Sequence, residues 1–347
     1  MTEKKFIKAL QGTRYEQPPF WLMRQAGRYL PEYRELRAKA GGFLDMVYNS
    51  QFATEVTMQP LRRFGMDAAI LFSDILVIPH ALGQKLEFVA GEGPKLDAIE
   101  NAEGLVKLSE GNVDKVLQPV YDTVKNLRSQ MVQEGMAGTA LIGFAGAPWT
   151  VATYMVEGGG SKTFEKVKAF AYRDPVGFAQ LIDIVTEATI HYLKKQIEAG
   201  AEAIQIFDSW AGVLDQDQFA QWVMVPTIKI VNAVKTAYPD VPVIGFPKGA
   251  GILYESYAQN TGVDAIGLDT QVPTKWAAEV LQPELPVQGN LDPVALLVGG
   301  DALEKEARRI LEDLSEGPYV FNLGHGVIKE TPPEHVGQLA KIIRGEA

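Results

Sequence analysis

Short apolar, β-branched runs alternate with longer polar-apolar segments along most of the chain. Most of the intervening segments are long enough to form a helix. Alternation of this kind is typical of repeated βα units that build a parallel sheet. The candidate strands occupy residues 20–23, 68–72, 140–144, 203–207, 243–246, 265–268, 286–288 and 319–323.

The clearest helical pattern predicts a helix over residues 175–199. Asp174 is a suitable N-cap, Pro175 fits the first helical position, and Gly200 can end the helix in the left-handed region. The apolar residues of the segment fall near one face, as in an amphipathic helix. Similar patterns occupy residues 219–237 and 303–314.

Eight candidate strands predict a closed (β/α)8 barrel of the TIM type, and a doubly wound open sheet is the rival fold. Polar groups that follow the strands favour the barrel, because barrel enzymes build their sites at the C-terminal ends of the strands. The general polarity of loops explains about half of these positions. The polar or reactive residues are Arg24, Gln25, Ser73, Asp74, Trp149, Asp208, Ser209, Lys248, Asp269, Asn290, Asp292 and His325.

Composition narrows the classes of protein. The chain has 347 residues, of which 46% are hydrophobic and 22% charged, and it contains no cysteine. Disulfides, thiolate metal sites and a cysteine nucleophile are therefore excluded. The net charge of −10 disfavours duplex nucleic acid as a partner. Residues 1–40 nevertheless carry +5, which favours an anion-binding region within an acidic protein.

Neither a secretion signal nor a membrane span is expected. The first 17 residues contain no continuous apolar run. The most apolar stretch, residues 67–82, is interrupted by Asp74 and Pro79 and is too short to cross a bilayer. We expect a soluble, cytoplasmic protein.

Two arginines after the first candidate strand suggest an anion clamp. Arg24 and Arg28 are four residues apart and would face the same way if the backbone were helical there. A guanidinium group binds a carboxylate through two parallel hydrogen bonds. The alternative that the spacing also allows is that both form surface ion pairs with Glu32 and Glu35.

Asp74 lies among apolar neighbours. A carboxylate in such a setting needs hydrogen-bond donors, a positive partner or protonation. We interpret it as a group that accepts N–H bonds from a ligand or stabilises a cation. The alternative is a structural, capping aspartate.

Two glycine-containing segments are also notable. The segment 157–162 suggests a mobile loop beside a site, and a plain hinge is the alternative. The segment lacks the spacing of a phosphate-binding P-loop, which disfavours nucleotide binding. His325 lies between two glycines after the last candidate strand, where the backbone can approach a ligand closely. The sequence contains no His-Glu-x-x-His pair that would bind a metal.

Taken together, these motifs closely resemble the uroporphyrinogen decarboxylase family of tetrapyrrole biosynthesis. The first and fourth matching segments are highly specific, and all occur in the family's order over almost the whole chain. The matching segments are residues 24–34, 71–76, 146–150, 154–161 and 322–326.

The resemblance implies a single distorted (β/α)8 barrel over residues 1–347 that acts as a homodimer without metal or organic cofactor. Its implied reaction removes four acetate carboxylates from uroporphyrinogen III and yields coproporphyrinogen III and CO2. Asp74 is the expected catalytic residue. The implied substrate-binding residues are Arg24, Gln25, Ala26, Gly27, Arg28, Arg37, Phe43, Asp74, Tyr154, Ser209 and His325, among which Arg37 and Phe43 rest on weaker local matches.

Two other functions remain open from the sequence. A related barrel methyltransferase would generally use zinc held partly by cysteine, which this chain lacks. A non-catalytic tetrapyrrole carrier would not need so many polar strand-end groups. The identity of the proton donor also remains open. His325 has a suitable unperturbed pKa, and Arg37 or Tyr154 could position or relay the proton.

Overall fold

Seven parallel strands form the central sheet of the protein, which a computed structural model describes over residues 4–89 and 93–346. Their order is β1-β4-β5-β6-β7-β8-β9, so the strands of this sheet lie side by side in the order in which they occur along the chain. The strands are β1 (Ala68–Ile70), β4 (Ala140–Gly146), β5 (Ala203–Asp208), β6 (Val243–Pro247), β7 (Ala265–Gly267), β8 (Val287–Leu291) and β9 (Tyr319–Leu323). This order and the helical crossovers confirm the predicted barrel-type fold rather than the open, doubly wound sheet.

An early segment of the chain joins the two edges of this sheet. Phe20 forms a parallel bridge with Phe321 of β9, and Trp21 N donates to Phe321 O at 3.3 Å. On the other side, Asp67 N, next to β1, donates to Phe20 O at 3.0 Å. The predicted strand 20–23 is thus reduced to one bridge, and the barrel closes through a short and irregular eighth element.

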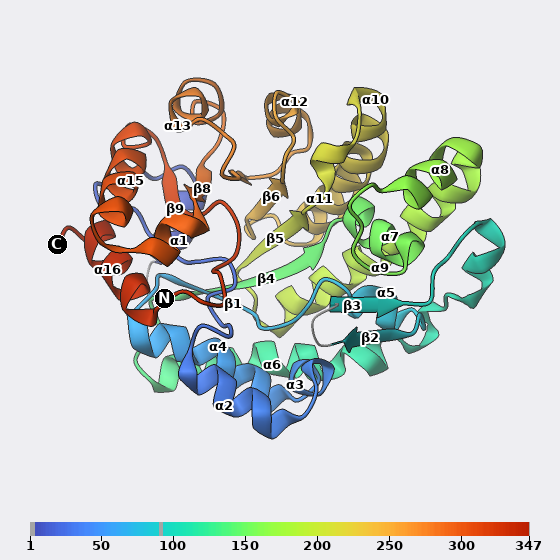
Figure 1. Ribbon diagram of the computed structural model, residues 1–347, viewed down its shortest axis with the longest axis horizontal. Helices are drawn as coiled ribbons and strands as arrows, with labels where there is room; N and C mark the ends of the chain where they lie inside the picture. The colour runs from blue at the N-terminus through green and yellow to red at the C-terminus, as the bar shows by residue number, and fades with distance from the viewer. Residues whose placement is uncertain (1–3, 90–92, 347) are drawn as a thin grey trace.

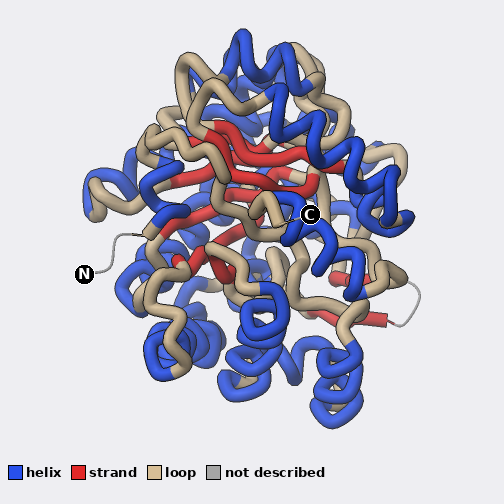
Figure 2. The backbone as a smooth tube through the Cα atoms, turned by 90° about the vertical axis from the view of Figure 1, so that its left-hand side faces the viewer, coloured by secondary structure: helices blue, strands red, loops and turns tan. Residues whose placement is uncertain are grey.

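Helices surround the strands. Figure 2 shows the strands gathered in the middle of the molecule with helices around them. In Figure 1, α2, α4 and α6 lie below the sheet, whereas α10, α12 and α13 lie above it. The helices are α1 (Lys5–Leu10), α2 (Pro31–Ala40), α3 (Phe43–Val47), α4 (Ser50–Phe64), α5 (Val77–Ala81), α6 (Val113–Gln133), α7 (Pro148–Glu157), α8 (Glu165–Arg173), α9 (Pro175–Ala199), α10 (Gln216–Phe219), α11 (Val225–Ala237), α12 (Leu253–Asn260), α13 (Thr274–Trp276), α14 (Pro293–Val298), α15 (Gly300–Asp313) and α16 (Pro333–Ile343).

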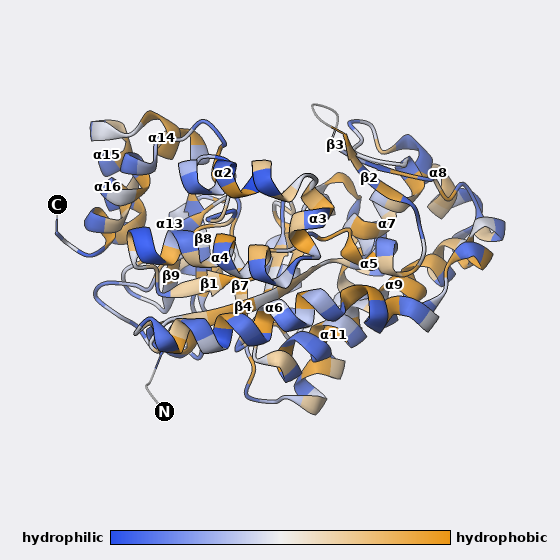
Figure 3. Cartoon of the chain, turned by 90° about the horizontal axis from the view of Figure 1, so that it is seen from below, coloured by the Kyte–Doolittle hydropathy of each residue, from blue (hydrophilic) through white to orange (hydrophobic). Residues whose placement is uncertain are grey.

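The apolar interior has two parts. A smaller cluster fills the inside of the barrel and includes Trp21, Ile142, Ile244 and Phe246. A larger cluster lies between the strands and the surrounding helices. The outer helices, such as α6 in Figure 3, accordingly carry hydrophobic residues on one side and hydrophilic residues on the other. Alternate residues of each strand therefore face the barrel interior or the helices.

The longest helix has the boundaries that its sequence predicts. Asp174 caps α9 by accepting a hydrogen bond from Gly177 N at 2.8 Å, and Pro175 occupies the first turn. Gly200 follows the end of the helix and has φ of 123°, a backbone conformation that residues other than glycine rarely adopt. Fixed ends of this kind set where the chain enters and leaves the strands.

An antiparallel hairpin beyond the barrel was not predicted. Its strands are β2 (Leu86–Val89) and β3 (Gly93–Leu96), with Leu86 paired to Leu96. Leu96 N donates to Gly158 O at 3.0 Å, which attaches the hairpin to the end of α7. The hairpin consequently lies beside α5 and α7 (Figure 1).

Candidate active site

Asp74 lies in the loop that follows β1 and is half-buried. Its Oδ1 atom accepts a hydrogen bond from Leu76 N at 2.8 Å. Burial raises the pKa of the Asp74 carboxyl to about 6, although the Leu76 N–H and the positive charge of Arg24 both oppose the increase. The carboxyl therefore has a donor and a cationic neighbour, as the sequence led us to expect, and it is ionised at neutral pH.

Arg24 is the electrostatic centre of the site. Its charge acts on the pKa values of Asp74, Tyr154 and His325, which come from three separate parts of the chain. Its side chain packs on the backbone of Gly326, where a Cβ atom would overlap it. We call Arg24, Asp74, Tyr154 and His325 the central cluster.

The backbone around Arg24 is not helical. Arg24 has φ of 61°, in the left-handed region that non-glycine residues seldom adopt. Helix α2 begins only at Pro31, so the expectation that a helix aligns Arg24 with Arg28 is wrong. The ion-pair alternative is not supported for Glu32, which instead lies 3.2 Å from Arg63.

Tyr154 brings α7 into the central cluster. Burial and the negative charge of Asp74 raise the pKa of its phenol to about 12, and the positive charge of Arg24 opposes that increase. Its ring lies 4.2 Å from that of Trp210, measured between ring centroids. Trp210 follows Ser209 in the loop after β5, so Tyr154 packs against the residue next to Ser209. Ser209 itself is half-buried.

His325 is neutral at physiological pH. Burial, together with the charges of Arg24 and Lys248, lowers the pKa of its imidazole to about 4, and the charge of Asp269 opposes that decrease. Its Nδ1 atom accepts a hydrogen bond from Gly326 N at 2.6 Å, which assigns the proton to Nε2. His325 is therefore suited to donate a neutral hydrogen bond, and its ordinary pKa is a poor guide to this position.

Arg37 and Phe43 form a second group near the central cluster. The Arg37 guanidinium carbon lies 5.3 Å from the centre of the Phe43 ring, a cation–π arrangement. Phe43 also packs against Phe72 and Phe88, with ring centroids 5.8 and 4.6 Å apart. The Nη1 atom of Arg37 is buried and has no hydrogen-bond partner among the described residues. A buried, unpaired donor of this kind is available to a carboxylate ligand.

Arg28 lies on the same side as Arg37. Burial raises the pKa of Tyr33, and the charges of Arg37 and Arg28 both oppose that increase. Tyr33 packs edge-on against Phe72, two residues before Asp74, with 5.9 Å between ring centroids. Arg28 is itself exposed. Both arginines therefore lie near Tyr33, which packs on the loop that carries Asp74.

Gln25 supports the Arg24 loop from beneath. Its side chain is fully buried, accepts from Leu22 N at 3.2 Å and donates to Ala68 O at 3.3 Å. Its amide is therefore occupied by the backbone of its own loop and of β1. Ala26 and Gly27, which follow it, are half-buried in the same turn.

Aromatic rings line the inside of the barrel below the cluster. Phe144, Phe207 and Phe246 come from β4, β5 and β6, and consecutive rings contact edge-on at centroid distances of 5.6 and 6.0 Å. Phe207 is half-buried, and Ser209 follows it at the spacing of residues on the same face of a strand. The polar cluster thus lies above an apolar floor.

Several strand-end residues have structural roles instead. Asp208 is buried and accepts from Thr150 Oγ1, and burial raises the pKa of its carboxyl to about 7. Asp292 caps α14 by accepting from Val294 N at 2.8 Å. Trp149 is fully buried, and its indole donates to Trp210 O. Loop polarity therefore explains part of the strand-end pattern, as expected.

The glycine-rich segment after α7 is ordered by local hydrogen bonds. Gly158 has φ of 77° and ends α7, and Gly159 bridges to Lys95 of the hairpin. Glu157 accepts from Val167 N at 3.0 Å. These contacts fit a helix end joined to the hairpin better than a hinge.

Lys248 and Asp269 were predicted at strand ends but not grouped with His325. Both contribute to the electrostatic surroundings of its imidazole. Asp269 is buried and accepts from Gly249 N at 2.5 Å and from Tyr254 Oη at 3.0 Å. The order of the strands in a barrel places the ends of β6, β7 and β9 around one mouth, which is the signal that would have grouped them.

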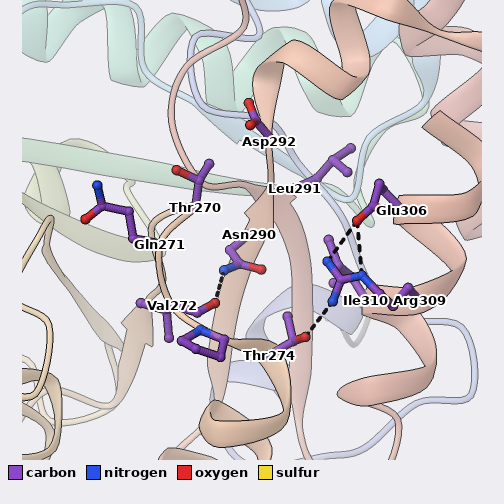
Figure 4. Close-up of a pocket in the computed structure, with 11 residues that line it drawn as sticks. Thr270, Gln271, Val272, Thr274, Asn290, Leu291, Asp292, Glu306, Arg309 and Ile310 are labelled. Carbon is purple, nitrogen blue, oxygen red and sulfur yellow. Dashed lines mark hydrogen bonds and ion pairs between the residues drawn. The ribbon is translucent and has the colours of Figure 1, made fainter. Parts of the chain in front are cut away.

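A further pocket of about 310 Å³ is lined by a different set of residues (Figure 4). It is formed by the loop after β7, the end of β8 and α15, and no member of the central cluster lines it. Arg309 within it is paired with Glu306 at 3.0 Å and donates to Thr274 Oγ1 at 2.8 Å. Its cation is therefore already neutralised by the protein.

Residues 4–89 and 93–346 contain neither a metal-binding cluster nor a membrane-spanning helix. No group of three or more histidine, aspartate or glutamate side chains is arranged to hold a metal ion there. Over the same residues, no helix combines the length and apolar character needed to cross a bilayer.

Comparison with known proteins gives a consistent family assignment. Residues 1–345 match the family model for uroporphyrinogen decarboxylase (URO-D). The chain is 53% identical over 343 residues to a uroporphyrinogen decarboxylase of Rhodospirillum rubrum, covering 99% of this chain and 97% of that protein. It is 54% identical over 344 residues to that of a Chelativorans species, covering 99% of each chain.

Solved structures agree on the fold. A methyltransferase from Methanosarcina mazei superimposes with a TM-score of 0.79 over 98% of this chain and 97% of that chain, at 22% sequence identity. At that identity the likeness concerns the fold alone.

Proposed function

The chain belongs to the uroporphyrinogen decarboxylase family, and from this membership we propose how its central cluster carries out the reaction. The reaction converts the four acetate arms of uroporphyrinogen III into methyl groups and releases four molecules of CO2. The observation that carries the proposal is the position of Asp74, a carboxylate next to Arg24 at the mouth of an apolar barrel.

The substrate provides its own electron sink. Protonation of a pyrrole carbon beside an acetate arm produces a cationic iminium group. The bond between the methylene and carboxyl carbons then breaks, CO2 leaves, and the electron pair neutralises the iminium. Protonation of the methylene carbon and loss of the ring proton restore the pyrrole, so each arm consumes one proton overall.

Asp74 stabilises the positive charge that develops on the ring. Its ionised carboxylate accepts hydrogen bonds from the pyrrole N–H groups, and its backbone bond from Leu76 holds it in place before the substrate arrives. A preorganised charge that is sheltered from water contributes several kcal/mol or more to such a step. The aromatic floor accommodates the apolar part of the macrocycle.

The arginines hold the outer carboxylates. Arg24, Arg28 and Arg37 belong to the positively charged first 40 residues, which compensate locally for a net charge of −10. The buried Nη1 of Arg37 lacks a protein partner within the described residues and is assigned to a substrate carboxylate. Tyr154, Ser209 and neutral His325 add hydrogen bonds, while Gln25, Ala26 and Gly27 shape the loop that carries Arg24 and Arg28.

The family also leads us to propose the wider setting of the enzyme. We infer a single domain over residues 1–347 that forms a homodimer in the cytoplasm and needs no organic cofactor. Light scattering tests the dimer, and limited proteolysis tests the single domain.

Turnover of uroporphyrinogen III tests the proposal directly. The protein is incubated with the substrate without oxygen and with a metal chelator, while CO2 and the number of remaining carboxylates are followed. We expect coproporphyrinogen III and four CO2 per substrate. Turnover that needs added zinc or a corrinoid would instead indicate a methyltransferase-like enzyme, and binding without CO2 release would indicate a tetrapyrrole carrier.

A further inference from the structure

Lys248 follows β6 directly and lies in register with its inward-facing residues. Ile244 and Phe246 belong to the cluster inside the barrel. Side chains alternate along a strand, so position 248 continues the same face one residue beyond the last strand residue, Pro247. Lys248 is half-buried at this point.

The backbone at Lys248 is fixed by the loops on both sides. Lys248 N donates to Asp208 O at 3.0 Å, and Lys248 O accepts from Gly212 N at 3.1 Å. The next residue, Gly249, donates to Asp269 Oδ2 at 2.5 Å and packs so tightly against Gly212 that a Cβ atom at residue 212 would overlap it. The lysine therefore projects from a rigid support between the ends of β5 and β7.

The Lys248 ammonium has no hydrogen bond or ion pair among the residues that the structure describes. Other partly buried lysines do: Lys4 lies 2.6 Å from Glu202, Lys235 lies 2.9 Å from Asp264, and Lys168 donates to Val213 O. Instead, its charge acts on His325 of the central cluster. A half-buried cation on a well-supported backbone, without a counter-ion among the described residues, is suited to bind an anionic ligand.

We propose that Lys248 binds a propionate carboxylate of the tetrapyrrole, an inference that rests on the proposed function. A cation beside a reacting acetate would slow its loss, because the carboxylate gives up its charge as CO2 forms and the cation stabilises only the starting state. The contact therefore belongs to an arm that does not react. Propionates are the carboxylates that persist through all four decarboxylations.

Lys248→Met tests this contact, with Lys248→Arg as the charge-retaining variant. Lys125→Met on the exposed face of α6 is the matched control, because it removes the same charge away from the barrel mouth. For Lys248→Met we expect KM for uroporphyrinogen III to rise about tenfold or more, as for the loss of one charge-assisted hydrogen bond, with kcat changed much less. Lys248→Arg should restore most of the affinity.

Inhibition by the product shows whether Lys248 contacts a propionate or an acetate arm. Coproporphyrinogen III retains the propionates and lacks the acetates, so its inhibition constant should rise in Lys248→Met by a factor similar to that for KM. An unchanged KM would overturn the proposal. A higher KM with unchanged product inhibition would also overturn it, since the contact would then be with an acetate.

A measurement without substrate checks the geometry. In Lys248→Met the pKa of His325, followed by NMR, should rise because one neighbouring positive charge is removed. An unchanged His325 pKa would place Lys248 away from the central cluster. Failure of the proposed function would appear separately, as absence of decarboxylation by the unmodified protein.

Discussion

The side chain of Arg24 crosses the backbone of Gly326 so closely that a methyl group on residue 326 would overlap its Cδ and Cγ atoms. Two segments from opposite ends of the chain therefore meet at the centre of the site. Gly326 has a backbone conformation open to other residues, since its φ is not in the positive region. The contact with Arg24, rather than local geometry, is what requires glycine.

Gly326→Ala should therefore displace Arg24 while leaving the fold intact. We expect kcat/KM for uroporphyrinogen III to fall about 10- to 100-fold, as for the loss of a hydrogen bond to a charged group. Gly337→Ala in α16 is the control, because a Cβ atom there meets nothing within 4 Å. In an Arg24→Ala background the same change at Gly326 should have little further effect. Equal losses in both backgrounds would show that Gly326 acts independently of Arg24.

The pKa of Asp74 gives a pH dependence of stability with a defined sign. Its folded pKa of about 6 is above the ordinary value of 3.8, so the folded protein binds the proton more tightly than the unfolded chain. The free energy of unfolding should consequently fall as pH rises from about 4 to 6. Asp74→Asn removes this contribution. The free energy of unfolding of the variant minus that of the parent should therefore be larger at pH 7.5 than at pH 4.5. Denaturant unfolding at both pH values measures the difference, and parallel curves would contradict the raised pKa.

Ionisation of the Asp74 carboxyl should also control activity, which should rise with pH where stability falls. If the ionised Asp74 carboxylate stabilises the ring cation, kcat/KM should increase with pH through about 6 and then level off. Activity that rises as pH falls below 5 would show that the protonated carboxyl is the active form.

His325 should remain neutral across the physiological range. Its pKa of about 4 predicts that the imidazole signals in an NMR titration do not shift between pH 5.5 and 8. The signals are assigned from their loss in His325→Gln. A midpoint near the ordinary value of 6.5 would refute the neutral form and return His325 to the candidates for a charged proton donor.

Asp208 depends on Thr150 for its hydrogen bond. Thr150→Val should lower the free energy of unfolding by about 1–3 kcal/mol, because it leaves a buried carboxyl without this donor. Thr153→Val is the matched control on the same helix, since Thr153 donates only to Trp149 O, one turn earlier. Urea unfolding of both variants compares them, and equal losses would show that the bond to Asp208 contributes nothing specific.

Much of the fold was predictable because its signals are local. Apolar runs located each of the seven sheet strands, and Asp174, Pro175 and Gly200 fixed the ends of α9. The segment 20–23 was less accurate, since a strand that closes a barrel is defined by its partners, Phe321 and Asp67, far along the chain. The hairpin of β2 and β3 was missed for a similar reason, because part of what holds it is its contact with the end of α7.

The candidate residues were easier to predict than their chemical states. Strand-end position identified Asp74 and His325, but the direction of each pKa shift depends on burial and on charges from distant segments. Nothing in the sequence around Gln25 shows that its amide is occupied by Leu22 and Ala68. Likewise, nothing in the sequence marks Arg24 as a residue with a left-handed backbone.

The central claim is that the negative charge of Asp74 stabilises the cationic ring. Single-turnover CO2 release from bound uroporphyrinogen III, compared between the parent and Asp74→Asn, tests it most directly, with Asp74→Glu to keep the charge. We predict that Asp74→Asn folds and binds the substrate but releases CO2 about a hundredfold or more slowly, the size of effect seen when one preorganised electrostatic group is removed. CO2 release by Asp74→Asn at close to the parent rate would contradict the account.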